Sequence, residues 1–348
     1  MDKKILHHSR YQPNAMGHGG ERRTTQIVEY YTQQGYEIVP LHLNFKKRFT
    51  LISLVKAFFI IYKVYGLTDW KSVNKFRKYW RDIARILPQL ENYFAQNIKT
   101  FVWESVHDEY YYIAHFARKY HKEIVAFPHN IESLVLNQKS ALTNKLSPHG
   151  FEKDIDILKK CELVNTISRF DTQLLSMFGI NAEFFPYNPP KRATDFLLDI
   201  KAKRSERIKS PTKQILILGT AHNPPTRIGM ERLIQILNDI DNESLQVTIA
   251  GFGTEKLKSI IKKDFIVVKG QLLQTDLETE MINCDALLVN QPPTTGALTR
   301  VTEFLQAGIP VILNIESAHS HFEKDDIIIY DSNIKLIEII VRLCQSRK

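Results

Sequence analysis

Cysteine is scarce in this sequence of 348 residues, which contains Cys161, Cys284 and Cys344 and no other. The three are far apart, odd in number and without CxxC spacing, so neither a disulfide framework nor a zinc site built on cysteine is expected. This usage fits a reducing compartment, and we expect a cytoplasmic protein.

Long apolar runs are also missing. Residues 1–8 turn polar before a signal-peptide core of roughly 7 to 15 residues could form, so secretion is not expected. The most apolar segment, residues 50–65, has about 16 residues and includes lysines, whereas a spanning helix needs roughly 20 apolar residues. Two interpretations remain open: an interfacial helix with snorkelling lysines at an anionic membrane surface, or an ordinary helix packed on its domain.

Acidic residues are fewer than basic ones, since 38 Asp and Glu stand against 47 Lys and Arg, for a net charge of +9. This balance favours an anionic partner such as nucleic acid, an anionic membrane surface or a phosphate-bearing ligand. Many basic residues lie between Lys46 and Arg85, interleaved with aromatic residues, which indicates one local surface. No helix-turn-helix, zinc or RNA-binding signature accompanies the charge, so nucleic-acid binding is not expected.

The composition is that of a folded protein, with 43% hydrophobic and 24% charged residues. A single core stops growing at roughly 250 to 300 residues, so the length predicts two domains. Strand, glycine-bearing loop, helix and strand follow one another in the order of a right-handed β-α-β unit, and the alternation begins again in the second half. The expected fold is α/β, with a doubly wound sheet in each domain.

The boundaries of the expected elements come from apolar runs and capping residues, such as Ser168 before a helix and Gly179 after it. Expected strands cover residues 4–8, 36–43, 100–103, 123–127, 163–166, 182–185, 214–219, 245–250, 265–268, 286–289 and 310–314. Expected helices cover residues 21–34, 110–120, 151–160, 169–178, 229–237, 255–262, 276–282, 299–307 and 333–345. The sequence thus predicts an N-terminal domain at 1–190, a linker at 191–212, a C-terminal domain at 213–332, and a helix at 333–348 that could pack back on the first domain.

The first candidate site is the glycine-rich loop after the first strand, which includes His18, Gly19 and Gly20 and opens a helix. Glycines let a ligand approach the backbone, and the free amides and helix dipole favour an anion. The spacing is not the GxGxxG fingerprint, so a dinucleotide site is disfavoured. A tight turn without a ligand is the alternative.

The second candidate site is the segment His129, Asn130 and Glu132, at the carboxyl end of the expected strand 123–127. Open α/β sheets bind their ligands at such ends. Histidine and asparagine can hydrogen-bond sugar hydroxyls or a phosphate, and histidine can carry a proton near neutral pH. A purely structural histidine is the alternative.

The third candidate site is a glycine-containing loop that runs into the expected helix 299–307. The backbone amides of Gly296, Ala297 and Leu298 lie where a helix N-terminus can bind a diphosphate. Arg300 can add charge-assisted contacts, and Glu303 can accept hydrogen bonds from ribose hydroxyls. The alternative is an ordinary helix start with a solvated arginine and glutamate.

The run Gly-x-x-x-Arg-x-x-Glu-x-x-x-x-Gly-x-Pro-Val, from Gly296 to Val311, resembles the donor-site segment of GT-B glycosyltransferases, particularly family 4, glycosyl transferases group 1. The loop from Gly219 to Arg227 resembles the one that opens the second domain of these enzymes, and the strand end at Gly253 resembles their G-x-G segment. The glycine, histidine and asparagine loops of the first half match their first domain, so the resemblance covers nearly the whole chain.

The resemblance implies two Rossmann-like domains that face each other across a cleft, with the nucleotide-sugar donor on the C-terminal domain and the acceptor on the N-terminal one. Glu303 is expected to hold the ribose and Arg227 and Arg300 the diphosphate, while His129 lies near the transferred sugar. We accordingly expect catalytic roles for His129 and Glu303, and substrate contacts from His18, Asn130 and Glu132. The expected donor site comprises Gly19, Gly20, Gly219, Arg227, Gly253, Thr295, Gly296, Ala297, Leu298, Arg300 and Glu303.

Basic side chains and helix N-termini stabilise the departing diphosphate in this family, so no obligatory metal ion or other cofactor is expected. The expected activity is hexosyl transfer, with retention, to a glycan or lipid-linked acceptor in cell-surface polysaccharide synthesis, at the inner face of the plasma membrane. One departure from the family stands out, because Thr295 occupies the place of a second glutamate. A catalytically inactive relative that binds glycan or stabilises a partner transferase is the alternative.

Overall fold

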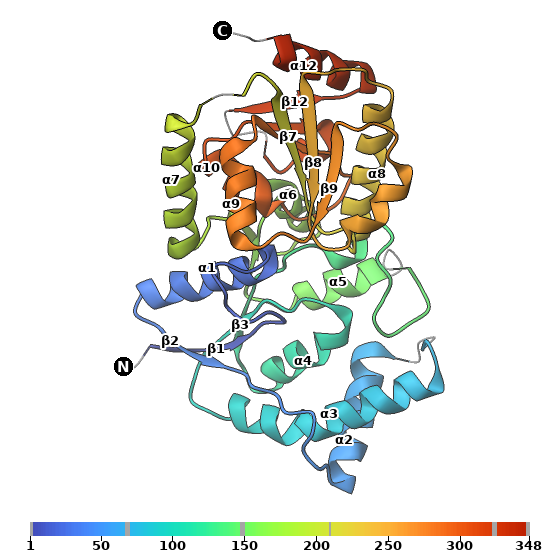
Figure 1. Cartoon of the computed structure of the whole chain (residues 1–348). Coiled ribbons are helices and arrows are strands. Elements are labelled where there is room, and N and C mark those ends of the chain that lie inside the picture. Colours follow the sequence, from blue (N-terminus) through green and yellow to red (C-terminus); the bar gives the residue numbers. More distant parts are fainter. Residues whose placement is uncertain (1–2, 67–69, 147–149, 209, 322–325, 346–348) are drawn as a thin grey trace. The chain divides into compact units, whose positions relative to one another are not determined.

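The computed structural model describes residues 3–66, 70–146, 150–208, 210–321 and 326–345. Its contacts divide the chain into two compact units, and Figure 1 labels many of their elements. The first unit is Met1–Tyr187 with Thr295–Ala297, and the second is Asn188–Thr294 with Leu298–Lys348. Each unit contains a six-stranded sheet with helices, which confirms the expected α/β fold with two doubly wound domains.

The first sheet is entirely parallel, in the order β2-β1-β3-β4-β5-β6. The order reverses direction between β1 and β3, which makes this the topological switch point of the sheet. Apolar runs form these strands because parallel sheets are covered on both faces. The strands are β1 (Lys4–His8), β2 (Glu37–Pro40), β3 (Thr100–Trp103), β4 (Glu123–Ala126), β5 (Leu163–Thr166) and β6 (Ala182–Phe184).

The basic and aromatic region of the first unit forms two helices, α2 and α3, which pack against each other and against α4. The first unit also has 3-10 turns at η1 (Asp108–Tyr110) and η2 (Glu132–Leu134). Its helices are α1 (Gly19–Gln33), α2 (Leu51–Tyr65), α3 (Val73–Phe94), α4 (Tyr111–Lys119), α5 (Phe151–Leu158) and α6 (Arg169–Met177).

Helix α2 packs through one face only. Ser53, Ala57, Ile61 and Tyr65 are buried at four-residue spacing against the core of the unit. The opposite face, called here the α2 apolar face, consists of exposed Leu51, Ile52, Val55, Phe58, Phe59 and Tyr62. None of the helices in the described part of the chain has the length and apolar character needed to cross a membrane.

The second sheet is parallel in the order β12-β11-β10-β7-β8-β9, with its switch point between β7 and β10. Every residue of β10 and β11 is buried, as expected for central parallel strands. The strands are β7 (Lys213–Leu218), β8 (Leu245–Ala250), β9 (Ile266–Gly270), β10 (Ala286–Val289), β11 (Val311–Asn314) and β12 (Ile327–Tyr330).

One helix of the second unit was not among the expected elements. Residues 191–206, where a linker was expected, form helix α7, which packs on α9 and α10 because Leu197 and Ile200 point into the core. The expected helix at 333–345 coincides with α12, which buries Leu336 and Ile340 in a core cluster of the second unit. The helices are α7 (Lys191–Glu206), α8 (Pro224–Asn238), α9 (Gln274–Asn283), α10 (Thr299–Gln306), α11 (Ile315–Ala318) and α12 (Asn333–Gln345), with a 3-10 segment at η4 (Thr254–Ile260).

Candidate functional site

The switch point of the second sheet brings Gly219, which follows β7, next to Arg300 of α10. A Cβ atom added at Gly219 would lie 3.2 Å from Nη1 of Arg300, so a side chain there would compete with the guanidinium for space. Ligands of open α/β sheets bind beyond the carboxyl ends of the strands at this point. The structure thus places one of the predicted donor-site glycines and one of the predicted arginines together.

Gln291, two residues beyond the end of β10, holds the guanidinium in place. Its Oε1 atom accepts a hydrogen bond from Nη2 of Arg300 at 3.2 Å. The backbone of Gln291 is itself held by Asn314, because its N–H donates to Oδ1 at 3.0 Å and its carbonyl accepts from Nδ2 at 2.8 Å. Nε of Arg300 is buried and has no hydrogen-bond partner among the described residues. The guanidinium therefore has donor capacity left for a ligand.

Electrostatics give Arg300 a strong preference for an anion. Burial lowers the pKa of Arg300 to about 10, and the neighbouring carboxylate of Glu303 partly opposes this shift. The group stays charged at neutral pH, but little water compensates the charge. A diphosphate would supply both the missing negative charge and acceptors for the unused N–H group.

Helix α10 begins without a side-chain cap. Leu298 is the N-cap residue, its backbone is extended, and its side chain makes no capping hydrogen bond. The amides of this turn and the helix dipole therefore remain suited to an anion. Glu303 lies one turn further along and is buried.

The N-terminus of α1 differs, because His18 caps it. Nδ1 of His18 accepts hydrogen bonds from the amides of Gly20 and Glu21 at 3.1 and 3.5 Å, and the backbone N–H of His18 donates to the Glu21 carboxylate at 3.0 Å. A Cβ atom added at Gly20 would lie 2.7 Å from the ring of Tyr11. Two amides of the predicted anion loop that contains Gly19 and Gly20 are thus already engaged by a side chain.

Thr295–Ala297 belongs by its contacts to the first unit. The hydroxyl of Thr295 donates to the carbonyl of Ile131 and accepts from its N–H, both at 3.1 Å. The amide of Gly296 donates to Oδ2 of Asp171 at 2.8 Å. The Gly296 amide, which was predicted to donate a hydrogen bond to a phosphate, therefore donates to a carboxylate in the structure.

Three further predicted site residues, Arg227, Asn130 and Glu132, lie outside the contacts around Arg300. The Arg227 side chain is 53% exposed and lies 3.7 Å from the Glu231 carboxylate on α8. In the first unit, Glu132 accepts a hydrogen bond from Gln138 at 2.7 Å, and Asn130 lies next to Gly296. Among the described residues, no hydrogen bond links the Arg227 side chain to the Arg300 guanidinium.

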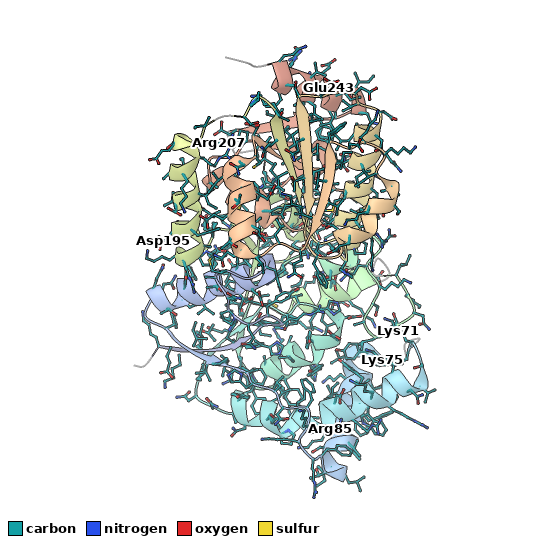
Figure 2. The ribbon with its side chains drawn as sticks, in the orientation of Figure 1. Lys71, Lys75, Arg85, Asp195, Arg207 and Glu243 are labelled. Carbon is teal, nitrogen blue, oxygen red and sulfur yellow. The ribbon has the colours of Figure 1, made fainter. Side chains whose placement is uncertain are left out.

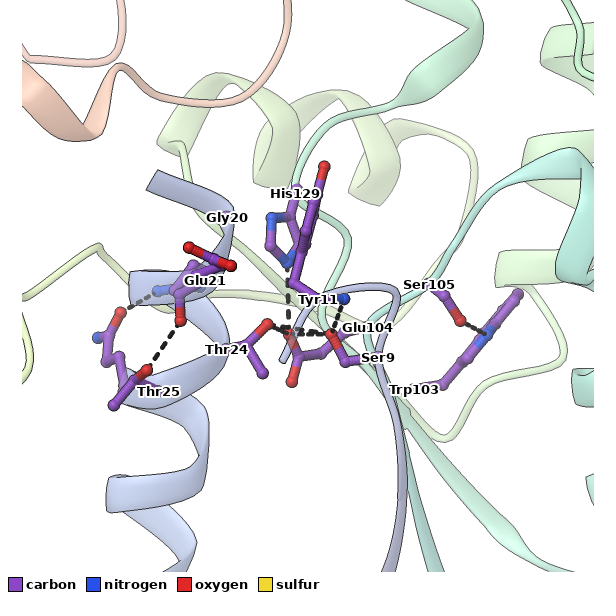
Figure 3. Close-up of polar contacts among 12 residues, drawn as sticks. Ser9, Tyr11, Gly20, Glu21, Thr24, Thr25, Trp103, Glu104, Ser105 and His129 are labelled. Atoms are coloured by element: carbon purple, nitrogen blue, oxygen red, sulfur yellow. Dashed lines mark hydrogen bonds and ion pairs between the residues drawn. The ribbon is translucent and has the colours of Figure 1, made fainter. Parts of the chain in front are cut away.

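A buried polar cluster occupies the switch point of the first sheet, and Figure 3 shows its contacts. Glu104, directly after β3, accepts hydrogen bonds from the Thr24 hydroxyl at 2.6 Å and from Nε2 of His129 at 3.3 Å. Its other oxygen pairs with Nε2 of His7 at the end of β1. The ring of Tyr11 stands beside that of His129, with centroids 5.5 Å apart. Residues from three neighbouring strand ends therefore meet on one carboxylate.

The cluster keeps Glu104 ionised. Burial alone would raise the pKa of this carboxyl, but the hydrogen bonds from His129 and His7 outweigh it and hold the pKa well below its usual range. A neutral His129 that donates from Nε2 has Nδ1 free to accept a hydrogen bond. The predicted catalytic histidine is thus oriented by a carboxylate that the sequence analysis did not single out.

The site residues that the sequence did not predict occupy equivalent places in the fold. Glu104, Gln291 and Asn314 all lie at or just after the carboxyl end of a strand. Polar residues directly after apolar strand runs are the signal that could have found them. Their partners are remote in sequence, so the hydrogen bonds themselves could not be anticipated.

The sequence matches no family model and no curated protein. Solved structures resemble it over almost its whole length. HepE from Anabaena in complex with UDP has a TM-score of 0.64 at 12% identity, covering 99% of this chain and 91% of HepE. Sucrose-phosphate synthase from Thermosynechococcus elongatus has a TM-score of 0.66 at 12% identity, covering 99% of this chain and 90% of the synthase.

WaaG, a glycosyltransferase involved in lipopolysaccharide biosynthesis, has a TM-score of 0.61 at 12% identity, covering 98% of this chain and 90% of WaaG. These similarities confirm the expectation of a GT-B fold with two Rossmann-like domains. At such low identity they establish the fold, while the reaction must be argued from the residues.

Proposed function

We propose that this protein is a glycosyltransferase that moves a hexosyl group from a nucleoside diphosphate sugar to a glycan or lipid-linked acceptor. The observation that carries the proposal is the Arg300 guanidinium, which is half-buried at the switch point of the second sheet and whose Nε has no hydrogen-bond partner among the described residues. An anion with several oxygens is the ligand that such a group lacks. HepE, a structural neighbour, has been crystallised with UDP and with UDP-glucose.

The donor contacts follow from the geometry of α10. Arg300 and the uncapped first turn of the helix would bind the diphosphate, and Glu303 would accept hydrogen bonds from the ribose. The Arg300 guanidinium and the helix N-terminus would stabilise the negative charge that grows on the diphosphate as its bond to the sugar breaks. This stabilisation needs no metal ion, and we propose none. Arg227 and the amides of Ala297 and Leu298 remain proposed donor contacts, whereas the amide of Gly296 is held by Asp171.

In the first unit, Glu104 would fix His129 so that its Nδ1 accepts a hydrogen bond from a hydroxyl of the transferred sugar. His18, Asn130 and Glu132 are proposed acceptor contacts in the same unit. A groove of about 570 Å³ is lined by Gln12 and residues 41–46. It offers room for further sugar units of a glycan acceptor, next to the unit that reacts. We propose transfer with retention.

The α2 apolar face favours an acceptor carried by a lipid. Between the packed-helix and interfacial interpretations, the observed burial supports the second, because the six large side chains of the α2 apolar face are exposed. Helix α2 also carries exposed Lys56 and Lys63. Further basic residues, among them Lys71, Lys75 and Arg85, lie on the neighbouring helix α3 and in the segment before it (Figure 2). An exposed apolar face on a helix with basic residues fits an anionic membrane surface, and we propose peripheral attachment at the inner face of the plasma membrane.

Co-sedimentation with vesicles tests the attachment. Phe59, which is 64% exposed, is replaced by serine, and Ile334→Ser is the matched control because Ile334 is 72% exposed on α12 of the other unit. Transfer of a phenylalanine out of water contributes about 1.5 to 3 kcal/mol, so Phe59→Ser should weaken binding to vesicles with phosphatidylserine roughly tenfold or more. Equal binding by both variants and the wild type would contradict the attachment.

Transfer itself is tested by release of nucleoside diphosphate from a panel of nucleotide sugars with glycan and lipid-linked acceptors. We expect acceptor-dependent release that Glu303→Ala abolishes. Tight nucleotide binding without release in any combination would instead favour the inactive relative. Absence of both binding and release would contradict the proposed donor site.

A further inference from the structure

An aromatic pair lies at the carboxyl ends of β7 and β8 in the second unit. The rings of His222 and Phe252 have centroids 4.5 Å apart and planes inclined by 30°. His222 is exposed, and Phe252 is 57% exposed although its ring already rests on an imidazole. A single exposed phenylalanine is ordinary in a soluble protein, so its meaning depends on how it is held and on what lies beside it.

The backbone around the pair is closely fitted. The amide of Ala221 donates to the carbonyl of Phe252 at 2.9 Å, which ties the loop after β7 to the loop after β8. Gly253 has a φ of 80°, and a Cβ atom added to it would lie 2.6 Å from the His222 ring. Any other residue at 253 would be strained and would displace the imidazole. The two loops that carry His222 and Phe252 are therefore held together by their backbones.

The pair lies next to the proposed diphosphate site. A Cβ atom added at Gly251 would lie 1.9 Å from the carbonyl oxygen of Gly219, so these two strand ends touch. Gly219 is also the residue against which the Arg300 guanidinium packs. A chain of direct contacts thus runs from Arg300 through Gly219 and Gly251 to Phe252.

We propose that the exposed face of Phe252, supported by His222, stacks on the nucleobase of the nucleotide-sugar donor. This inference rests on the proposed function, because it places the base relative to a diphosphate at Arg300. In a nucleoside diphosphate sugar, the base and the sugar lie at opposite ends of the diphosphate, with a ribose between the base and the phosphates. A flat apolar ring at the neighbouring strand end is the surface that such a base needs.

The stacking surface has a consequence for specificity. Every nucleobase presents a π-face, so stacking adds affinity and discriminates little between bases. Removal of the Phe252 ring should therefore lower the affinity for UDP and the affinity for ADP by similar factors. Inorganic pyrophosphate has no base, and its affinity should depend on Arg300 but not on Phe252.

The test measures dissociation constants for UDP, ADP and pyrophosphate by calorimetry on the full chain. Base stacking on an aromatic side chain is worth about 1 to 3 kcal/mol, so Phe252→Ala should weaken UDP and ADP roughly 5- to 150-fold. Pyrophosphate should bind unchanged, and Phe252→Trp should retain nucleotide affinity. The matched control is Ile334→Ala, which removes a comparably exposed apolar side chain from α12 and should change none of the constants.

Tryptophan at position 252 gives a second readout. The natural tryptophans, Trp70, Trp80 and Trp103, all belong to the first unit. UDP should quench the additional fluorescence of Phe252→Trp, and pyrophosphate should not. Undiminished nucleotide binding by Phe252→Ala, or an equal loss of pyrophosphate binding, would overturn the stacking proposal alone. If the wild type binds pyrophosphate but no nucleotide, or binds neither, the proposed donor site fails together with it.

Discussion

Replacement of Arg300 by methionine is expected to stabilise the ligand-free protein while it removes the response to nucleotide. Burial lowers the pKa of Arg300 from 12.5 to about 10, and one pKa unit corresponds to about 1.4 kcal/mol. The charged guanidinium therefore costs the free protein on the order of 3 kcal/mol. Methionine removes that cost and loses the hydrogen bond to Gln291, which is worth about 1.5 to 3 kcal/mol because its donor is charged. A net gain of up to about 1.5 kcal/mol in the free energy of unfolding remains.

The ligand response should change in the opposite direction. At a UDP concentration of about 100 times the dissociation constant, the wild type should gain about 2.7 kcal/mol of stability. Loss of one or two charge-assisted hydrogen bonds, each worth about 1.5 to 3 kcal/mol, should weaken UDP roughly 100-fold. The same UDP concentration should then stabilise Arg300→Met by only about 0.4 kcal/mol.

The assay is urea denaturation of the wild type and the variant, with and without UDP. Arg227→Met is the matched control for the ligand-free measurement, because that side chain is 53% exposed and its pair with Glu231 lies at the surface. Surface ion pairs contribute about 0 to 1 kcal/mol, so the control should unfold almost as the wild type does. A less stable Arg300→Met protein, or one that UDP stabilises as strongly as the wild type, would refute the reasoning.

The remaining predictions concern the cluster of the first unit and the role of metals. Glu104→Gln should lower the free energy of unfolding by about 3 kcal/mol, since it breaks a buried pair with His7 and His129, and an unchanged urea midpoint would contradict this. Burial lowers the pKa of His8 from 6.5 to about 3, so the unfolded chain takes up a proton below pH 6.5 that the folded chain refuses. Stability should therefore fall as the pH drops from 6.5 toward 3, by about 1.4 kcal/mol per pH unit, and denaturation at several pH values should show a shallower fall for His8→Gln. Dialysis against EDTA should leave nucleoside diphosphate release unchanged, and activity restored only by added divalent metal would argue for an obligatory ion.

Regular elements of the second unit could be predicted closely because apolar runs and caps are local signals. The expected strand at 286–289 coincides with β10, and the expected helix at 299–307 ends one residue beyond α10. Helix α8 begins at Pro224, five residues before the expected start at Gly229, since proline is tolerated in the first turn of a helix. The expected helix at 255–262 is a 3-10 segment at Thr254–Ile260.

Elements whose stability depends on distant partners were not predicted. The run of charges in α7 obscured the buried positions Leu197 and Ile200, which a linker would not have. Whether α2 exposes or buries its large apolar side chains depends on how α3 and α4 pack beside it. A periodic pattern could not choose between these arrangements, because both faces of α2 are rich in apolar residues.

The candidate site shows the same division. Arg300 and Glu303 could be proposed from the sequence because a glycine loop before a helix is a local pattern. The partners of Arg300, Gly219 and Gln291, reach it through the switch point of the sheet, which only the strand order reveals. Glu104 was missed for this reason, since His7 and His129 lie far from it in sequence.

A calorimetric titration of the wild type and Arg300→Met with UDP, ADP and GDP tests the central claim most directly. The account predicts saturable one-to-one binding of at least one of these nucleotides to the wild type, weakened roughly 100-fold or more by the substitution. Absence of saturable binding, or equal affinity in the two proteins, would contradict a diphosphate site at the carboxyl ends of β7 and β10.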